Sequence, residues 1–188
     1  MIKKILAAGI MLAAMQGCGS DSDSTGETVQ KGPGAALKCT SSGMNAWDTY
    51  GAAAFVAVNE SIVTHVVSEL TANGSTNLGT SFTKVGSGDP ASTTDDMATF
   101  KGKLAAFLVY AYGGPTSIEY TDKKTYSGLQ NMAAAHAGLA ITDDQYDYFI
   151  INQVVPALTD NGVPESDVTS CFAPIVLDKA FKASIVGK

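Results

Sequence analysis

Apolar side chains recur in this chain at the three- and four-residue intervals that place them on one face of a helix. Between residues 52 and 70 they are Val56, Val63, Val66, Val67 and Leu70. A second set, Met97, Phe100, Leu104, Phe107 and Leu108, follows the capping segment 94–96. Gly113-Gly114-Pro115 ends that helix near Tyr112. Because no segment shows sustained alternation with a period of two, the pattern predicts an all-α fold.

Two polar stretches interrupt the helical pattern. Residues 71–90 are rich in Gly, Ser, Thr and Asn, and they predict a long loop. Residues 116–127 are polar and predict an irregular segment. A short helix is predicted from Leu129 to Leu139, with His136 after Met132 and three alanines.

Helix signals in the second half of the chain are punctuated by proline. Thr142 and Gln145 have the spacing of a capping box, which predicts a helix over 143–158. Pro156 lies inside that pattern and is expected to kink or shorten the helix. A last helix is expected over 165–185, with Pro174 dividing it into two pieces.

The N-terminus has the form of an export signal. Lys3 and Lys4 precede eleven apolar residues, 5–15, which are too few to span a membrane. Gly17-Cys18 resembles the cleavage box of a bacterial lipoprotein, in which Cys18 would carry the lipid, whereas Met15-Gln16 matches that box poorly. Ordinary secretion with cleavage nearby is the alternative. Either interpretation places the protein outside the cytoplasm, and the first makes it a membrane-anchored lipoprotein facing the periplasm or the cell exterior.

The remaining sequence predicts one domain behind a tether. Residues 1–18 form the signal, 19–36 a flexible tether rich in Ser, Asp and Gly, and 37–188 a single domain. Of 188 residues, 45% are hydrophobic and 16% charged, which is typical of a globular protein. The net charge of −6 argues against a nucleic-acid partner, because such binding depends on Lys and Arg. Contact with a membrane is expected only through the lipid anchor.

If Cys18 carries lipid, two cysteines remain. Cys39 and Cys171 can pair in an oxidising compartment, or they can stay as two separate buried thiols. The sequence has no CxxC motif and no His/Cys cluster, which argues against a structural zinc site.

The chain has only two histidines, His65 and His136. No Ser/His/Asp arrangement accompanies them, and two histidines alone cannot build a dinuclear metal site. With a catalytic triad and a dinuclear metal site set aside, the remaining candidate is a haem site, in which one axial histidine holds the iron in an apolar pocket. His136 suits this role because the small residues before it would let a flat porphyrin approach the helix. An ordinary surface or core histidine is the alternative.

Several motifs in order carry a resemblance to a family. They are residues 107–115 ending in Gly-Gly-Pro, Tyr126-Ser-Gly128, Met132-Ala-Ala-Ala-His136 with Ile141-Thr142 behind it, Gly162-Val-Pro164 and Phe172-Ala-Pro174. From about Trp47 to Val176 the chain resembles the group I truncated haemoglobins. The resemblance implies a two-on-two α-helical sandwich around haem b, with His136 as the proximal ligand of the iron.

The resemblance also implies the surroundings of the haem. The helix from Met97 to Tyr112 would cover the distal face, with Phe100, Lys103 and Leu104 nearest the sixth coordination site. Phe107 would pack on the porphyrin, and Tyr146 and Phe149 would line the proximal side. The implied cofactor-binding residues are His136, Phe100, Lys103, Leu104, Phe107, Met132, Tyr146, Phe149 and Thr64.

The chain departs from the family at the distal side. The tyrosine that usually donates a hydrogen bond to bound oxygen aligns with Thr64, and a shift of one residue would place His65 there. The sixth site is then open to ligands such as NO or CO, or closed by Lys103, or closed by His65. Losing one hydrogen bond to bound oxygen costs roughly 1.5–3 kcal/mol, which argues against tight oxygen storage.

Two functions follow. The first is a haem protein outside the cytoplasm that binds the diatomic gases O2, NO or CO or exchanges electrons with a redox partner protein, with NO oxidation or peroxide chemistry as the enzymatic version. The second is a haem-free globin-like lipoprotein that acts as a structural or partner-binding domain.

Overall fold

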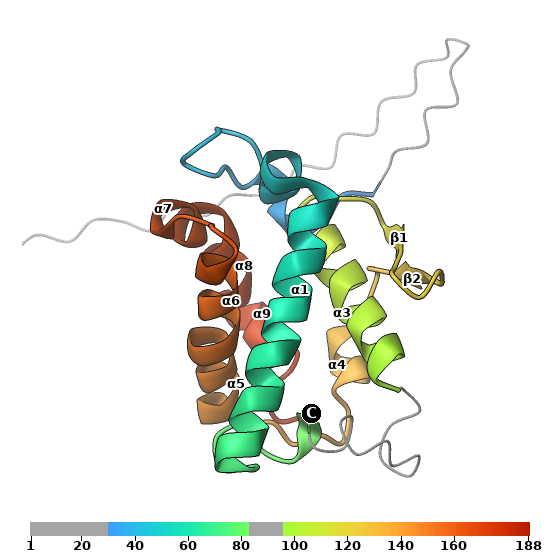
Figure 1. The fold of residues 1–188 in the computed structure, drawn as a ribbon, viewed down its shortest axis with the longest axis vertical. Helices are drawn as coiled ribbons and strands as arrows, with labels where there is room; N and C mark the ends of the chain where they lie inside the picture. Colours follow the sequence, from blue (N-terminus) through green and yellow to red (C-terminus); the bar gives the residue numbers. More distant parts are fainter. Residues whose placement is uncertain (1–29, 83–95) are drawn as a thin grey trace, which may run out of the picture.

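The computed structural model of the chain describes residues 30–82 and 96–188. The predicted signal, with Cys18, and most of the predicted tether lie outside these residues, as does the second half of the predicted loop at 71–90. The described part is rich in helix, with one small two-stranded sheet. A long helix, α1 (Ala46–Asn73), stands between α3 (Met97–Ala111) and α4 (Met132–Ala135) on one side and the helices of residues 143–176, α5 to α8, on the other (Figure 1).

Helix α1 runs from Ala46 to Asn73 and exceeds the predicted range at both ends. The side chain of Asn45 accepts a hydrogen bond from the amide of Asp48 (2.8 Å) and caps the helix. A kink occurs at Gly51, whose φ of 72° lies in the left-handed region that favours glycine. By length and composition α1 could also cross a membrane. In this fold, however, it buries Phe55 and Ile62 against the neighbouring helices.

Helix α3 runs from Met97 to Ala111 and begins where the sequence predicts. Asp96 caps it by accepting a hydrogen bond from the amide of Thr99 (2.7 Å). Its fully buried face consists of small residues: Gly102, Ala105, Ala106, Val109 and Ala111. Because these side chains are short, α3 can approach its neighbours closely.

The predicted irregular segment at 116–127 contains a β-hairpin instead. Strands β1, Ser117–Glu119, and β2, Thr125–Ser127, are antiparallel, with Ile118 opposite Tyr126. Strands of three residues are too short to produce an alternating pattern, so they could not be predicted from the sequence. The hairpin packs on the outer side of α3 (Figure 1).

Helix α4 is shorter than the predicted helix at 129–139. It runs from Met132 to Ala135 and is capped by Asn131, whose side chain accepts a hydrogen bond from the amide of Ala134 (3.0 Å). His136 is the C-terminal capping residue rather than a residue inside the helix. The prediction of a longer helix was wrong because Gly138 adopts a φ of 78°, which turns the chain away.

Two nearly continuous helical columns form the second half. The first comprises α5, Asp143–Phe149, the π-helical turn η2, Ile150–Val154, and α6, Val155–Asp160. The second comprises α7, Glu165–Asp167, the π-helical turn η3, Val168–Phe172, and α8, Ala173–Val176. The predicted capping box is present, with reciprocal bonds between Thr142 and Gln145.

Each of these columns accommodates a proline in the same way. Pro156 and Pro174 both lie in the first turn of an α-helical segment that directly follows a π-helical turn. Because proline lacks an amide hydrogen and crowds the preceding turn, the wider π turn removes the conflict. The helix is therefore reshaped at Pro156 rather than ended there.

The last helix, α9, runs from Lys179 to Ala183 after a break at Leu177–Asp178. Lys182 pairs with Asp143 (3.0 Å) and Asp147 (2.7 Å) of α5. The amide of Ala140 donates a hydrogen bond to the carbonyl of Lys188 (2.8 Å), and the amide of Gly187 donates one to the carbonyl of Ile141 (2.9 Å). The C-terminal segment is thus fastened to the loop that follows His136.

The described part of the predicted tether is packed, not free. Pro33–Ala36 form a 3-10 turn, η1, and Gly32 and Gly34 are buried against the end of α3. A Cβ on Gly32 would lie 1.8 Å from the carbonyl oxygen of Tyr110, so no other residue fits there. The domain therefore begins before residue 37.

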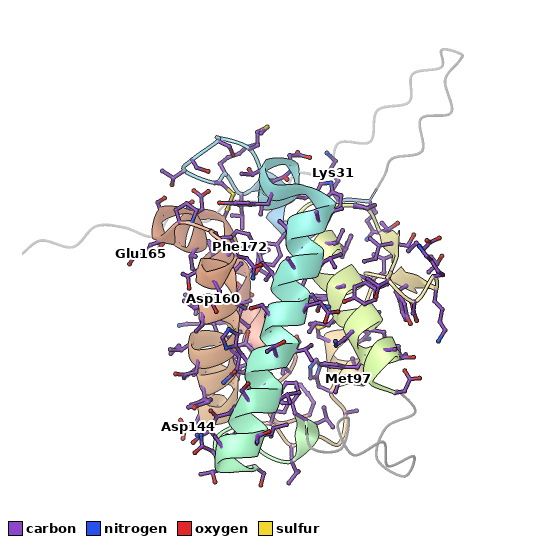
Figure 2. The ribbon with its side chains drawn as sticks, in the orientation of Figure 1. Lys31, Met97, Asp144, Asp160, Glu165 and Phe172 are labelled. Carbon is purple, nitrogen blue, oxygen red and sulfur yellow. A yellow bond between two sulfur atoms is a disulfide. The ribbon has the colours of Figure 1, made fainter. Side chains whose placement is uncertain are left out.

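A disulfide joins Cys39 to Cys171 across a sequence separation of 132 residues. Of the two alternatives left open by the sequence, a bridge or separate thiols, the structure has the bridge. Its yellow bond lies near Phe172, at the end of the helical columns where the N-terminal segment packs (Figure 2). Both cysteines are completely buried.

Candidate cofactor-binding cavity

A cavity of about 710 Å³ lies inside the fold, between α1, α3, α4, the α5–η2–α6 column and α9. Its walls are mainly aliphatic and aromatic side chains. The volume is within the range of sites that hold cofactors and small ligands, about 300–1,000 Å³. The fold thus forms a large, partly open apolar cavity with few polar groups.

Most of the predicted cofactor-binding residues line this cavity. They are His136, Phe100, Lys103, Leu104, Phe107, Met132, Tyr146 and Phe149. They belong to α3, α4 and α5, which are separated in sequence by the hairpin and by the loop after His136. Folding therefore brings together residues that the sequence distributes over fifty positions.

His136 is held in one orientation by the main chain. Its Nδ1 lies 2.8 Å from the carbonyl oxygen of Met132. Because a carbonyl oxygen can only accept, Nδ1 must carry the hydrogen, and in the neutral imidazole Nε2 is then the atom with the free lone pair. Among the residues that the structure describes, none hydrogen-bonds to Nε2. A metal-binding imidazole typically has this arrangement, in which the other nitrogen donates to a carbonyl.

The wall contributed by α1 is apolar. It consists of Ala54, Phe55, Val58 and Ile62, with Tyr50 at one end. Thr64 is exposed, and its hydroxyl donates to the carbonyl of Glu60 (2.9 Å). It lies two residues beyond Ile62, about 200° around a helix that turns 100° per residue. The assignment of Thr64 to the cofactor pocket was therefore wrong.

His65 is also away from the cavity. Its Nε2 lies 3.0 Å from Oδ2 of Asp160, at the end of α6. In Figure 2, Asp160 lies on the helical column beside α1. The register shift that would have placed His65 at the sixth coordination site does not occur.

Three tyrosines line the cavity, but each hydroxyl is engaged elsewhere. The hydroxyl of Tyr50 donates to Oδ2 of Asp167 (2.5 Å). The hydroxyls of Tyr112 and Tyr146 donate to the carbonyls of Phe172 (3.1 Å) and Val176 (2.7 Å). Burial raises the pKa of all three phenols, so they remain protonated. These hydroxyls hold the walls together rather than pointing a donor into the cavity.

Four phenylalanines that line the cavity were not predicted: Phe55, Phe82, Phe172 and Phe181. Phe82 stacks on Phe149 with centroids 5.4 Å apart, and its edge meets Phe100 at 6.2 Å. Phe181 of α9 stacks on Phe107 at 5.8 Å with an angle of 8° between the rings. Phe82 follows a loop-like sequence that gave no signal, whereas Phe181 belongs to a predicted helix whose inner face could have included it.

Lys103 lies at the mouth of the cavity. It lines the cavity and is at the same time an exposed residue of α3. A cation in that position places positive charge at the boundary between the apolar interior and water. An anionic group on the edge of a bound molecule would be stabilised there.

The donor set shows which kind of metal site fits. In residues 30–82 and 96–188, no three His, Cys, Asp or Glu side chains gather as a metal-binding group. Within these residues, a metal at Nε2 of His136 would not meet a set of three such side chains. Comparisons with protein-family models, with curated proteins and with solved structures gave no match for this chain.

Proposed function

We propose that this chain is an exported haem protein of the truncated-globin type, in which Nε2 of His136 binds the iron of haem b. The observation that carries the proposal is the imidazole geometry. The Nδ1 hydrogen of His136 is committed to the carbonyl of Met132, and the lone pair of Nε2 is left for a ligand in a large apolar cavity. An axial imidazole is a frequent haem ligand.

The walls of the cavity suit a flat apolar macrocycle. The aromatic rings of Phe100, Phe107 and Phe149 belong to helices on different sides of the cavity. Lys103 at the mouth is placed to meet a propionate, which is the charged part of haem. Apolar walls with a cation at the rim therefore match both parts of the molecule.

The arrangement of helices supports the globin-type sandwich. Helix α1 packs on α3, while the α5–η2–α6 column forms the other long side and also contacts α1. The cavity lies between these layers, and α4 is the short segment that carries His136 to it. Helical layers on either side of a cavity are compatible with the two-on-two sandwich that we propose.

The sixth coordination site, in this proposal, lies against an apolar wall. Phe55, Val58 and Ile62 take the place of a polar distal residue, and the nearby tyrosine hydroxyls are engaged. Bound O2 is stabilised by a hydrogen-bond donor, whereas NO and CO depend on one far less. We therefore favour NO and CO over O2 as ligands, with Lys103 as the side chain that can occupy the site in their absence.

Bound haem supplies reversible binding of diatomic gases and one-electron redox chemistry, while the protein sets access and ligation. The buried disulfide is in keeping with a protein outside the cytoplasm, because such bonds persist in oxidising compartments. Lipidation of Cys18 and export remain part of the proposal.

The test is the absorption spectrum of the full chain, expressed with ample haem. We expect a Soret band that is lost in His136→Gly and restored when free imidazole is added to that variant. His65→Ala is the matched control and should keep the band. Absence of the band in the unaltered protein would overturn the proposal and favour a haem-free partner-binding domain. Persistence of the band in His136→Gly without imidazole would overturn His136 as the iron ligand.

A further inference from the structure

Tyr50 connects the cavity to a buried carboxylate. Its ring lines the cavity, and its hydroxyl donates to Oδ2 of Asp167 at 2.5 Å. Asp167 is the one buried charged residue in the part of the chain that the structure describes, with 0% of its surface exposed. A phenol at a cofactor cavity thus has a base in direct hydrogen-bond contact.

The other two tyrosines of the cavity provide an internal comparison. Tyr112 and Tyr146 donate to main-chain carbonyls, at 3.1 and 2.7 Å. A neutral carbonyl is a very poor base, whereas a carboxylate can take up a proton. A phenol that loses an electron becomes a strong acid, so its oxidation is easiest where the proton can leave at once. Among the three, only Tyr50 has that acceptor.

Asp167 is held in its ionised form. The amide of Ser41 donates to Oδ1 (2.8 Å), and the hydroxyl of Ser41 donates to Oδ2. Burial alone would raise the pKa of Asp167, but hydrogen bonds from Ser41 and Tyr50 outweigh it and hold the pKa below its usual value. The disulfide at Cys39 and Cys171 fixes the two segments that carry Ser41 and Asp167. The acceptor is therefore present and ordered.

We propose that Tyr50 is a redox-active residue that delivers electrons to the cavity, with Asp167 as the acceptor of its proton. This inference rests on the proposed haem site, with hydrogen peroxide as the oxidant. In each step Tyr50 gives up one electron, its O–H bond breaks and the proton moves to Oδ2 of Asp167. A one-electron donor such as a small phenol then returns one electron to Tyr50 and releases its own proton to solution. The proton held by Asp167 moves back to the Tyr50 oxygen and restores the hydroxyl.

The balance is that of a peroxidase. Two such steps reduce one hydrogen peroxide to two waters and convert two phenols into two phenoxyl radicals. Tyr50 is only partly buried, so that a donor from solution can reach its ring. The function added to the haem site is one-electron oxidation of small phenolic molecules.

The test is electron paramagnetic resonance of the haem-loaded full chain, frozen shortly after addition of hydrogen peroxide. We expect a tyrosyl signal that is lost in Tyr50→Phe. Tyr112→Phe and Tyr146→Phe are matched controls, since each removes one cavity phenol that lacks a carboxylate partner, and both should keep the signal. The phenylalanine preserves the ring, so packing against Phe172 is retained.

A second measurement keeps the role of Asp167 testable. High-field spectra of the unaltered protein should show a phenoxyl oxygen with one strong hydrogen bond, from the proton transferred to Asp167. In Asp167→Asn the yield of the radical should fall at least tenfold at equal haem content. If this variant does not fold, the hydrogen-bond signature of the unaltered protein still decides.

The outcomes separate the two proposals. A chain without a Soret band ends the proposed haem function. A chain with the band but with the same radical in Tyr50→Phe, or with none in the unaltered protein, overturns the role of Tyr50 and leaves the haem site in place.

Discussion

The imidazole Nε2 of His65 lies 3.0 Å from Oδ2 of Asp160, and this contact links the middle of α1 to the end of α6 on the outside of the cavity. The resemblance of the sequence to the globin family made His65 a candidate for the sixth iron ligand. The contact with Asp160 instead makes it a surface link between two helices.

A prediction about the sixth ligand follows from this contact. In the haem-loaded protein, His65→Ala should leave the visible spectrum of the reduced form unchanged, because the side chain is not in the cavity. Lys103→Ala should convert a low-spin spectrum to a high-spin one if Lys103 occupies the site. A spectrum that changes with His65 and not with Lys103 would contradict the register of α1 described above.

The cap of α4 should affect haem retention. Asn131→Ala removes the side-chain oxygen that accepts a hydrogen bond from the amide of Ala134. Loss of this cap should lower the stability of the four-residue helix α4 by about 1 kcal/mol. Because the carbonyl of Met132 orients His136, haem should dissociate several-fold faster to a haem scavenger such as apomyoglobin. Asn152→Ala, an exposed change that also removes one side-chain bond to the main chain, is the control and should leave the rate unaltered. Equal rates in both variants would mean that α4 does not hold the ligand.

Asp167 should make stability depend on pH in the acid range. Its pKa is lowered in the folded protein, so the stability it contributes is present above its ordinary pKa and is lost as the pH falls through the folded value. Asp167→Asn should lower the free energy of unfolding by about 1–3 kcal/mol at pH 7. Urea denaturation at about pH 3 should show a smaller difference between the two proteins. A constant difference at both pH values would exclude a charged Asp167.

Loss of the disulfide should cost more than any single surface change. The bridge closes a loop of 132 residues, for which the chain-entropy model gives roughly 5 kcal/mol. The double variant Cys39→Ser, Cys171→Ser should unfold at a lower urea concentration than the oxidised protein. Urea denaturation with and without a reductant provides the check, since the reductant should have no effect on the double variant. A loss below 1 kcal/mol would show that the bridge is unimportant to the fold.

Gly102 is a packing requirement of the hairpin. A Cβ at this position would lie 2.2 Å from Cε2 of Tyr126, so Gly102→Ala should cost about 1–3 kcal/mol by forcing the ring aside. Combined with Tyr126→Ala the same change should cost much less, because the obstructing ring is gone. A thermal-unfolding double-mutant cycle measures this coupling, and simple additivity would contradict the close contact.

The elements that could be predicted from the sequence are those built from neighbours along the chain. The start of α3 at Asp96 and the start of α5 at Thr142 each depend on hydrogen bonds between residues three positions apart: Asp96 with Thr99, and Thr142 with Gln145. The apolar face of α3 was identified for the same reason, although it faces a cavity and small residues make its buried side. The spacing around Met132 and His136 marked the residue whose imidazole the structure places at that cavity.

What only the tertiary structure decided depends on contacts between distant positions. Tyr126 of the hairpin packs on Gly102 of α3. Asp167 is held ionised in the interior because Ser41 and Tyr50, more than a hundred residues earlier, donate hydrogen bonds to it. The kink at Gly51 and packing against α3 and α6 determine which face of α1 lines the cavity. The prediction that Thr64 lies on that face could not take these contacts into account. A repeat along the sequence specifies the face of a helix, but only the neighbours that cover that face determine its orientation.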